Sequence, residues 1–137
     1  MKFEVQSSSP QGVGALWKSQ SGDLPPIPSA IPPEFMGPGK GYSPEDLFAI
    51  SVLNCMIATY KVYCEKSKIS FSEIRGKAIL TVDMQEGSLK MTHLDITFDV
   101  QGASDPEKAR KVLDNAIRDC AVSNSIKSGK TFNITVR

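Results

Sequence analysis

The feature that most constrains this chain is one long apolar helix in its middle. The motif Ser43-Pro44-Glu45-Asp46 predicts the helix start, because a hydroxyl N-cap, a proline at the first helical position and acids in the first turn all favour a helix N-terminus. We expect this helix to run from Pro44 to Lys66. Its segment LFAISVLNCMIATY, residues 47–60, is apolar nearly all the way round. Such a helix must be covered on most sides, by a sheet on one face and by a second helix or a second subunit on the others.

Length, charge and hydropathy indicate the broad class of protein. The 137 residues fall within the usual size of one domain, so we expect residues 1–137 to form a single domain. Sixteen basic and fifteen acidic residues leave a formal charge of +1, which predicts neither a nucleic-acid partner nor binding to an anionic membrane. The N-terminus lacks the apolar core of a signal peptide, and no stretch approaches the roughly 18 to 20 apolar residues of a membrane span. We therefore expect a cytoplasmic protein.

The residues before the central helix predict little regular structure. Weak alternation within the first 20 residues favours a short hairpin. Residues 23–44 are dense in proline and glycine, so regular structure is not expected there. A disordered linker is the alternative, but there is no second domain to link, and several side chains are apolar enough to pack: Ile27, Ile31, Phe35, Met36 and Tyr42. We expect an irregular packed loop, in which Phe35, Met36 and Tyr42 are either pocket-lining or packing residues.

An antiparallel hairpin is expected after the central helix. Residues 74–84 and 89–100 alternate apolar and polar side chains on either side of a Gln85-Glu86-Gly87-Ser88 turn. The parity of the apolar positions changes within the second strand. A bulge near Thr92-His93 reconciles its two halves.

A second helix with one buried stripe follows the hairpin. Ser104-Asp105-Pro106-Glu107 repeats the capping chemistry of the first helix. Apolar residues then recur at helical spacing: Ala109, Val112, Leu113, Ala116, Ile117 and Cys120. A short helical turn across residues 122–127 and a last strand at residues 132–136 complete the chain. The sequence therefore predicts an α+β fold.

The sequence lacks the residues that most common catalytic and metal sites require. The only histidine, His93, lies in a predicted strand far in sequence from any serine or cysteine of interest, so a structural histidine is a better interpretation than a catalytic base. One histidine and three scattered cysteines match no metal-ligand spacing, and we expect no metal. An odd cysteine count without CxxC spacing also argues against a disulfide framework. Reduced or redox-cycling thiols remain.

Helix geometry separates the three cysteines. Cys55 and Cys64 are nine residues apart in one helix, on opposite faces and about 13 Å apart along the axis, so they cannot pair. Cys64 falls in a more polar tail, where an ordinary packed or partly exposed thiol is expected. Cys55 lies mid-helix and Cys120 ends the other buried stripe, so packing the two helices together can bring their sulfurs close. The open alternative is that both are small core residues, as buried cysteine usually is.

A reactive Cys55 needs a group that lowers its pKa. Burial favours the neutral thiol, whereas a nearby cation favours the thiolate. Glu45 precedes Cys55 by ten residues, about 15 Å along the same helix, and cannot touch it within one chain. If the two residues cooperate, Glu45 comes from another subunit, by an antiparallel crossing of two such helices about a twofold axis. The all-round apolar helix favours the same dimer.

Two segments around the cysteines carry a family resemblance. They are GYSPEDLFAISVLNCM, with Glu45 and Cys55, and CAVSNSIKSGKTFNITV, with Cys120. Together with the order of elements, they resemble the OsmC/Ohr family of thiol peroxidases over essentially the whole chain. The resemblance implies an OsmC-like fold, with antiparallel sheets packed around a central buried helix, and an intertwined homodimer.

The same resemblance implies a reaction and roles for three residues. One cysteine attacks an organic hydroperoxide and becomes a sulfenic acid, and a second cysteine resolves it as a disulfide. By motif match Cys55 is the peroxidatic cysteine, Cys120 the resolving cysteine and Glu45 the residue that acts across the dimer interface. A dithiol reductant, lipoyl-type in some members, then reduces the disulfide. No cofactor or metal takes part.

The chain departs from that family at one position. In the family, an arginine before the cysteine helix stabilises the thiolate and is held by the glutamate that matches Glu45. Here no arginine precedes Arg75, and the cations before the helix are Lys2, Lys18 and Lys40. A lysine supplies a point charge but not the bidentate fork of arginine, and a plain solvated lysine is the alternative for Lys18 and Lys40. Two functions follow: a Cys-based organic hydroperoxide reductase, or a non-catalytic OsmC-fold dimer that binds an apolar or thiol ligand at the subunit interface.

Overall fold

The central helix forms with the bounds that the sequence predicts. In the computed structural model, which describes residues 1–137, helix α1 spans Pro44–Lys66. A reciprocal capping box closes its N-terminus: the Asp46 N–H donates to Ser43 Oγ, and the Ser43 N–H donates to the Asp46 carboxylate, both at 3.0 Å. The serine and the acid of the predicted start motif therefore satisfy two backbone donors.

Only one stripe of α1 is buried. Its buried side chains recur every four residues and share one face: Val52, Met56, Tyr60 and Cys64. Elsewhere on the helix, Ile50 is 38% exposed and Val62 is 48% exposed. Apolar surface of α1 therefore remains open to solvent in a single copy of the chain.

Helix α1 also has the length and composition of a membrane span. It contains an 18-residue window with a mean hydropathy of 1.5, of which 22% is buried. The expectation that no stretch approaches a membrane-spanning segment is therefore wrong. Core helices of water-soluble folds satisfy the same test of length and composition.

The chain divides into two compact units, which are described separately. The N-terminal unit comprises Met1–Leu47 and the C-terminal unit comprises Phe48–Arg137. The expectation of one domain over residues 1–137 stays a prediction.

The N-terminal unit contains a small antiparallel sheet. Strands β1 (Val5–Ser8), β2 (Trp17–Ser21) and β3 (Ile27–Ser29) lie in the order β1-β2-β3. The predicted hairpin is β1-β2. Strand β3 and the 3-10 helix η1 (Pro33–Phe35) correct the expectation that residues 23–44 lack regular structure. β3 is an edge strand, where a proline without an N–H is tolerated.

The proline-rich loop does not bury its large apolar side chains. Met36 is 89% exposed and Tyr42 is 44% exposed, whereas the small residues Ser29 and Ala30 are buried. The main chain approaches closely here, since a Cβ at Gly41 would lie 2.9 Å from the carbonyl carbon of Ser29. Backbone packing around small residues thus replaces the side-chain packing that we expected.

A second sheet belongs to the C-terminal unit. Strands β4 (Glu73–Gln85), β5 (Ser88–Gln101) and β6 (Gly129–Val136) lie in the order β4-β5-β6. The pair β4-β5 is antiparallel, as predicted, but β6 runs parallel to β5. The expectation of purely antiparallel sheets is therefore wrong. The intervening helices carry the chain back across the sheet, and such a crossover allows parallel pairing.

The β4-β5 hairpin has the predicted turn and bulge. Glu86 and Gly87 have φ angles of 49° and 82°, the left-handed values that a two-residue type I′ turn needs. The register passes from Thr81 opposite His93 to Val82 opposite Met91, which leaves Thr92 as the extra residue. The bulge near Thr92-His93 is confirmed.

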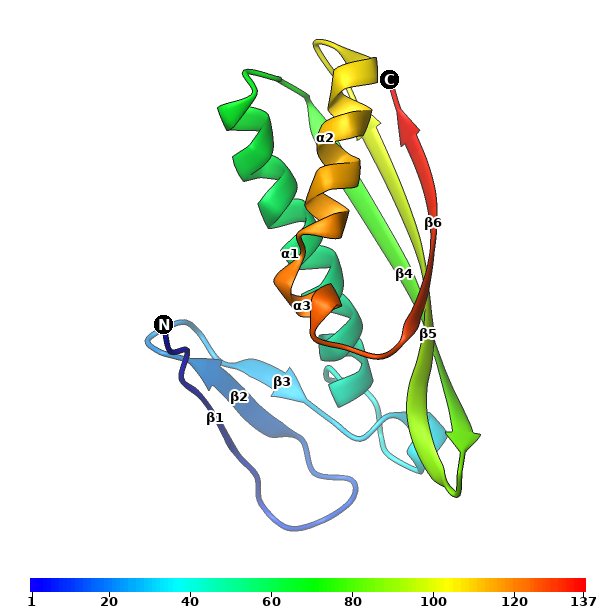
Figure 1. Cartoon of the computed structure of the whole chain (residues 1–137). Helices are drawn as coiled ribbons and strands as arrows, with labels where there is room; N and C mark the ends of the chain where they lie inside the picture. The colour runs from blue at the N-terminus through cyan, green and yellow to red at the C-terminus, as the bar shows by residue number, and fades with distance from the viewer. The chain divides into compact units, whose positions relative to one another are not determined.

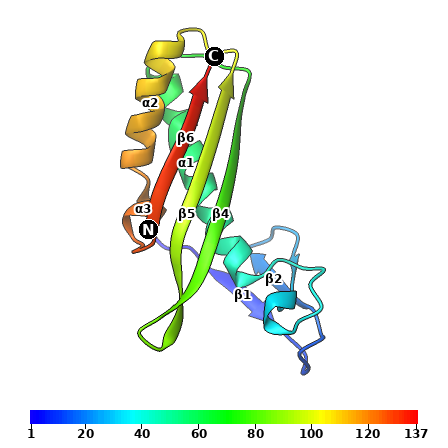
Figure 2. The same cartoon turned by 90° about the vertical axis from the view of Figure 1, so that its right-hand side faces the viewer.

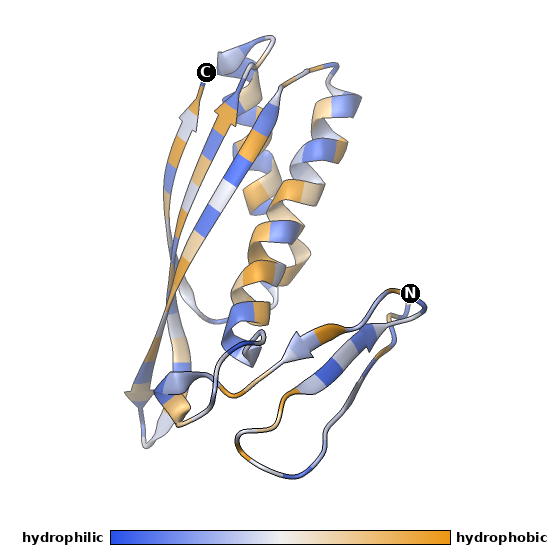
Figure 3. Ribbon diagram, turned by 180° about the vertical axis from the view of Figure 1, so that it is seen from behind, coloured by the Kyte–Doolittle hydropathy of each residue, from blue (hydrophilic) through white to orange (hydrophobic).

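Helices α1 and α2 (Pro106–Arg118) cover the same face of the β4-β5-β6 sheet (Figures 1 and 2). Apolar and polar residues alternate along the strands (Figure 3). The core between helices and sheet includes the following buried residues: Leu94, Ile96, Phe98, Val100, Ala109, Val112, Leu113 and Ala116. The predicted stripe of the second helix is thus confirmed, while the following helix α3 (Ala121–Asn124) is shorter than the turn expected at residues 122–127.

Removing a core ring should destabilise the C-terminal unit. Phe98 is fully buried in β5, so Phe98→Ala should lower the free energy of unfolding by about 3 to 5 kcal/mol through lost transfer energy and the cavity left behind. Denaturant unfolding measures this change. Phe132→Ala is the matched control, because Phe132 on the neighbouring β6 is 38% exposed and should cost clearly less. Equal costs for the two variants would contradict the described core.

Candidate active site

The C-terminal unit brings Cys55 and Cys120 within hydrogen-bonding reach of each other. Cys55 lies on α1 and is partly exposed, whereas Cys120 lies between α2 and α3 and is fully buried. Both are free thiols. Packing of the two long helices thus places the sulfurs together, in the way that the two apolar stripes of the sequence suggest.

Cys120 begins the short helix α3. As its N-cap residue, Cys120 accepts a hydrogen bond at its sulfur from the Ser123 N–H at 3.4 Å. Its carbonyl accepts from the Asn124 N–H at 2.9 Å. The first N–H groups of a helix have no partner within the helix. Those of Ala121 and Val122 are therefore free to act on a neighbouring group.

Neutral hydrogen-bond donors hold the pKa of Cys55 below its ordinary value. Burial raises the pKa of Cys55, but the Val122 N–H, the Cys120 thiol and the Ala121 N–H outweigh that effect by stabilising the thiolate. The Thr59 hydroxyl acts in the same direction. However, it already donates to the Cys55 carbonyl at 2.9 Å and has a single proton, so we regard the other three donors as the principal ones.

The pKa of Cys120 is shifted in the opposite direction. Burial and then the adjacent Cys55 raise the pKa of Cys120 to about 11, against the lowering effect of the Ser123 and Val122 N–H groups. One sulfur is therefore disposed to be the thiolate and the other to remain a thiol that donates to it. This asymmetry favours the thiolate at Cys55 and the neutral thiol at Cys120.

The donors around Cys55 are different from those that we expected. We predicted that a reactive Cys55 needs a charged neighbour, yet no charged side chain is among the groups that shift its pKa within this chain. Glu45 lies in the first turn of α1, while Lys18 lies on β2 and Lys40 in the loop before α1. All three belong to the N-terminal unit. The backbone N–H groups were missed because every residue carries one, so no sequence pattern marks them.

A second group of side chains, Tyr63, Arg118 and Asp119, was also missed. The Tyr63 hydroxyl donates to the Asp119 carboxylate at 2.7 Å, and Arg118 donates to both oxygens of that carboxylate at 2.9 and 3.0 Å. Arg118 and then Tyr63 lower the pKa of Asp119 to about 2. The adjacent charged residues Arg118 and Asp119, directly before Cys120, were the one hint of this group in the sequence. Tyr63 lies 56 residues before Asp119, so no local pattern connects it to them.

Cys64 stands apart from this pair. It is buried on α1, which agrees with the packed alternative of the expected packed or partly exposed thiol, and burial raises its pKa. Its neighbour Tyr60 is fully buried, and the Tyr60 hydroxyl has no hydrogen-bond partner of good geometry. Burial raises the pKa of Tyr60, and the nearby Cys64 sulfur adds to that rise. The Cys64 sulfur thus lies near the Tyr60 hydroxyl without a formed hydrogen bond.

His93 and the acidic residues form no metal centre. His93 Nε2 lies 3.1 Å from Thr131 Oγ1, and the Thr131 hydroxyl donates to Asp95. Since the threonine proton is thus used, His93 Nε2 is the donor of this pair. No group of three or more His, Cys, Asp or Glu side chains is placed to hold a metal ion.

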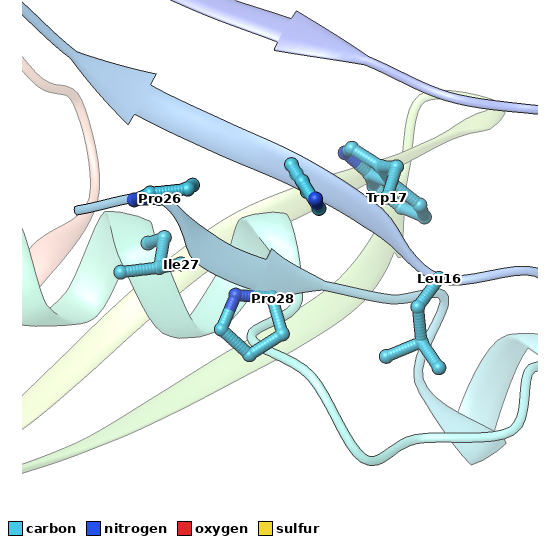
Figure 4. Close-up of a pocket in the computed structure, with 6 residues that line it drawn as sticks. Leu16, Trp17, Pro26, Ile27 and Pro28 are labelled. Carbon is cyan, nitrogen blue, oxygen red and sulfur yellow. The ribbon is translucent and has the colours of Figure 1, made fainter.

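The N-terminal unit has a shallow apolar hollow of about 360 Å³ (Figure 4). Its lining comprises Leu16, Trp17, Lys18, Pro26, Ile27 and Pro28. Lys18 is the only charged residue among them. The expected pocket residues Phe35, Met36 and Tyr42 do not line it.

Comparison with known proteins identifies the family. A family model described as OsmC-like protein matches residues 37–135, which is most of the chain. The protein therefore belongs to the OsmC-like family, and its α+β fold is the OsmC-like fold. No curated protein sequence matches this chain.

Solved structures with the same fold cover nearly the whole chain. An OsmC-like protein of unknown function from Vibrio cholerae has a TM-score of 0.84 at 13% identity, over 98% of this chain and 99% of that one. The organic hydroperoxide resistance protein OsmC from Legionella pneumophila has a TM-score of 0.77 at 20% identity, over 97% of each chain. The organic hydroperoxide resistance protein OhrB of Bacillus subtilis has a TM-score of 0.68 at 20% identity, over 98% of each chain.

The pKa order of the thiols can be measured directly. Alkylation by iodoacetamide requires the thiolate, so each rate rises with pH until the thiol has ionised. Cys55 should reach half of its plateau rate at a lower pH than an unstructured reference peptide, whereas the buried Cys120, whose pKa is raised, should remain unmodified at that pH. Peptide-resolved mass spectrometry across a pH series separates the sites. A Cys55 midpoint at or above that of the reference peptide would contradict the described donors.

Proposed function

We propose that this protein is a dimeric thiol peroxidase that reduces organic hydroperoxides, with Cys55 as the attacking cysteine and Cys120 as the resolving one. The observation that carries the proposal is the opposite shift of the two thiol pKa values across one contact. Membership of the OsmC-like family supports it, and two proteins of the same fold are named for organic hydroperoxide resistance. Cys55 is also partly exposed, so a substrate can reach its sulfur.

The first chemical step is attack of the Cys55 thiolate on a peroxide oxygen. An S–O bond forms as the O–O bond breaks, which leaves a sulfenic acid on Cys55 and an alcohol once the departing alkoxide has taken a proton. The Val122 and Ala121 N–H groups stabilise the thiolate before attack. The Cys120 thiol acts on the same sulfur and therefore lies near the site where the sulfenic acid forms.

The second step is resolution by Cys120. Its sulfur attacks the sulfenic sulfur, an S–S bond forms, and hydroxide leaves and takes the Cys120 proton as water. The raised pKa of Cys120 keeps it protonated until the departing hydroxide accepts its proton. A dithiol reductant, for which a lipoyl-type thiol is one chemical class, then returns both cysteines to thiols by exchange. Three free cysteines suit the reducing cytoplasm that we propose as its location.

The dimer is proposed from α1 and Glu45. The helix leaves apolar side chains such as Ile50 and Val62 open to solvent, and a second copy would cover that surface. In such a dimer Glu45 would act on the site of its partner and hold a cation, for which Lys18 or Lys40 are the candidates in the absence of the family arginine. Lysine there would add to the backbone donors that already act on Cys55.

Single cysteine variants should separate the roles. Cys55→Ser should reduce consumption of cumene hydroperoxide with a dithiol to the uncatalysed rate. When the dithiol is left out, Cys120→Ser should consume about one equivalent per chain and accumulate sulfenic acid, because attack remains but resolution is lost. Cys64→Ala is the control and should retain turnover, since Cys64 is not among the groups acting on Cys55. Turnover by Cys55→Ser equal to that of the wild type would refute the proposal.

Mixed dimers test whether Glu45 acts across the interface. When Glu45→Ala and Cys55→Ser chains are mixed and allowed to exchange, Cys55 of the first chain meets Glu45 of the second. About a quarter of the wild-type number of sites should then be intact, and activity should exceed that of either variant alone.

The matched control exchanges the wild type with the double variant Glu45→Ala/Cys55→Ser. In those mixed dimers the one remaining Cys55 faces a partner without Glu45, so they should add no activity. Recovery in the control but not in the test mixture would show that Glu45 acts within its own chain.

A second candidate function is a non-catalytic OsmC-fold dimer that binds an apolar or thiol ligand at the subunit interface. It is favoured by the absence of any arginine before Arg75 and of any charged side chain among the groups that act on Cys55. In that case a thiol ligand would exchange with Cys55, whereas no hydroperoxide would be consumed above background. The cysteine variants above therefore distinguish the two functions.

A further inference from the structure

We infer that Tyr63 and Asp119 are positioning residues, whose hydrogen bond fixes the turn that carries Cys120 against the helix that carries Cys55. The inference rests on the proposed function, because it assigns these residues a part in the same reaction. Neither residue lies in the motifs that identify the family. Both lie in the C-terminal unit, so the inference depends on one compact part of the chain.

The tie consists of short hydrogen bonds on an exposed part of the surface. Tyr63, two turns after Cys55 on α1, donates to Asp119 Oδ2 at 2.7 Å. Arg118 Nε donates to Asp119 Oδ1 at 2.9 Å, and another guanidinium nitrogen donates to Oδ2 at 3.0 Å. Such a fork fixes the direction of the carboxylate as well as its charge. Tyr63 thus meets an acceptor that is held in place.

Asp119 is the residue through which α1 can act on Cys120. It is the C-cap of α2 and directly precedes Cys120, and its N–H donates to the Asn115 carbonyl at 3.0 Å. Among the side-chain hydrogen bonds between α1 and this turn, the Tyr63–Asp119 bond is the one that does not involve Cys55. Rotation of Asp119 would therefore move the sulfur of the next residue relative to α1.

The turn has two further side-chain ties, at its other end. The Asn124 side-chain amide donates to the Arg118 carbonyl at 3.1 Å. Lys130 on β6 donates to the Ser123 carbonyl at 3.2 Å. Between these ties lie Cys120, Ala121 and Val122, which supply the principal donors to Cys55. A helix of four residues has too few internal hydrogen bonds to hold those donors in one place by itself. Tyr63 and Lys130 thus hold opposite ends of the segment that stabilises the thiolate.

Loosening the Tyr63 end should weaken thiolate stabilisation. Hydrogen bonds weaken steeply as distance and angle depart from their optimum, so a small displacement of the Ala121 and Val122 N–H groups reduces their effect on Cys55. The same displacement would move Cys120 away from the sulfenic acid that it has to resolve. One change should therefore lower both the nucleophilicity of Cys55 at neutral pH and the rate of disulfide formation.

Tyr63→Phe is the sharpest variant, because it removes the hydroxyl and keeps the ring. We expect the pH profile of Cys55 alkylation to move upward, with a rate about threefold to tenfold below the wild type at pH values beneath the Cys55 midpoint, since one pKa unit is tenfold in thiolate. Tyr60→Phe is the matched control on the same helix. The Tyr60 hydroxyl has no partner, so its removal should leave the profile unchanged.

A double-mutant cycle completes the test. Asp119→Ala should shift the Cys55 profile in the same direction as Tyr63→Phe, and the double variant should be no worse than Asp119→Ala alone, because both changes remove one bond. The rate at which hydroperoxide-treated protein forms the Cys55–Cys120 disulfide should fall in parallel. Additive effects in the double variant would overturn the inference, as would a Tyr63→Phe profile that matches those of the wild type and Tyr60→Phe.

The readouts keep this inference separate from the proposed function. Alkylation needs no hydroperoxide, so a shifted Cys55 profile in a protein that consumes no hydroperoxide would support the positioning role and refute the peroxidase. An unshifted profile in an active peroxidase would do the reverse. If Asp119→Ala fails to fold, Asp119→Asn replaces it, because the amide weakens the fork to Arg118 at constant size.

Discussion

Packing of one four-residue stripe of α1 sets the geometry of the C-terminal unit. The stripe from Val52 to Cys64 fixes the rotation of the helix about its axis, since those side chains fill the core beneath it. Cys55 lies three residues after Val52 and therefore on the flank of the stripe rather than at its centre. The flank is where a side chain can touch the core and still reach solvent. Partial exposure of Cys55 beside a fully buried Cys120 follows from that one rotation.

The electrostatics of the thiol pair come from the backbone rather than from side-chain charge. Peptide N–H groups at the start of α3 are dipoles whose positive ends can face an anion, and a preorganised donor costs no rearrangement when the thiolate forms. The missing arginine therefore does not leave Cys55 without stabilisation. It does leave the thiolate without a full opposite charge from its own C-terminal unit. A cation from a partner or from the N-terminal unit would act in addition to these donors.

Local sequence patterns predicted the helices, turns and bulge better than the way in which the strands pair. The capping box at Ser43 and Asp46, the turn at Glu86-Gly87 and the bulge at Thr92 each depend on residues near one another in the chain, so short-range rules found them. The parallel pairing of β6 depends on a crossover that no local pattern records. Strand β3 was missed because a proline-rich segment can still pair along the edge of a sheet.

In the candidate site, too, residue identity was easier to predict than three-dimensional arrangement. Cys55 and Cys120 were predictable as candidates because cysteine has a distinctive chemistry, and packing of the two apolar helices was one way to bring their sulfurs close. The Ala121 and Val122 donors were not, because their side chains are ordinary and only the backbone conformation after Cys120 makes them useful. The contact between Tyr63 and Asp119 joins residues 56 positions apart, and a tyrosine on an amphipathic tail is usually a packing residue. The backbone donors and the Tyr63–Asp119 contact both depend on the position of the turn at Cys120. Because that turn is short, its position depends on contacts with neighbouring elements.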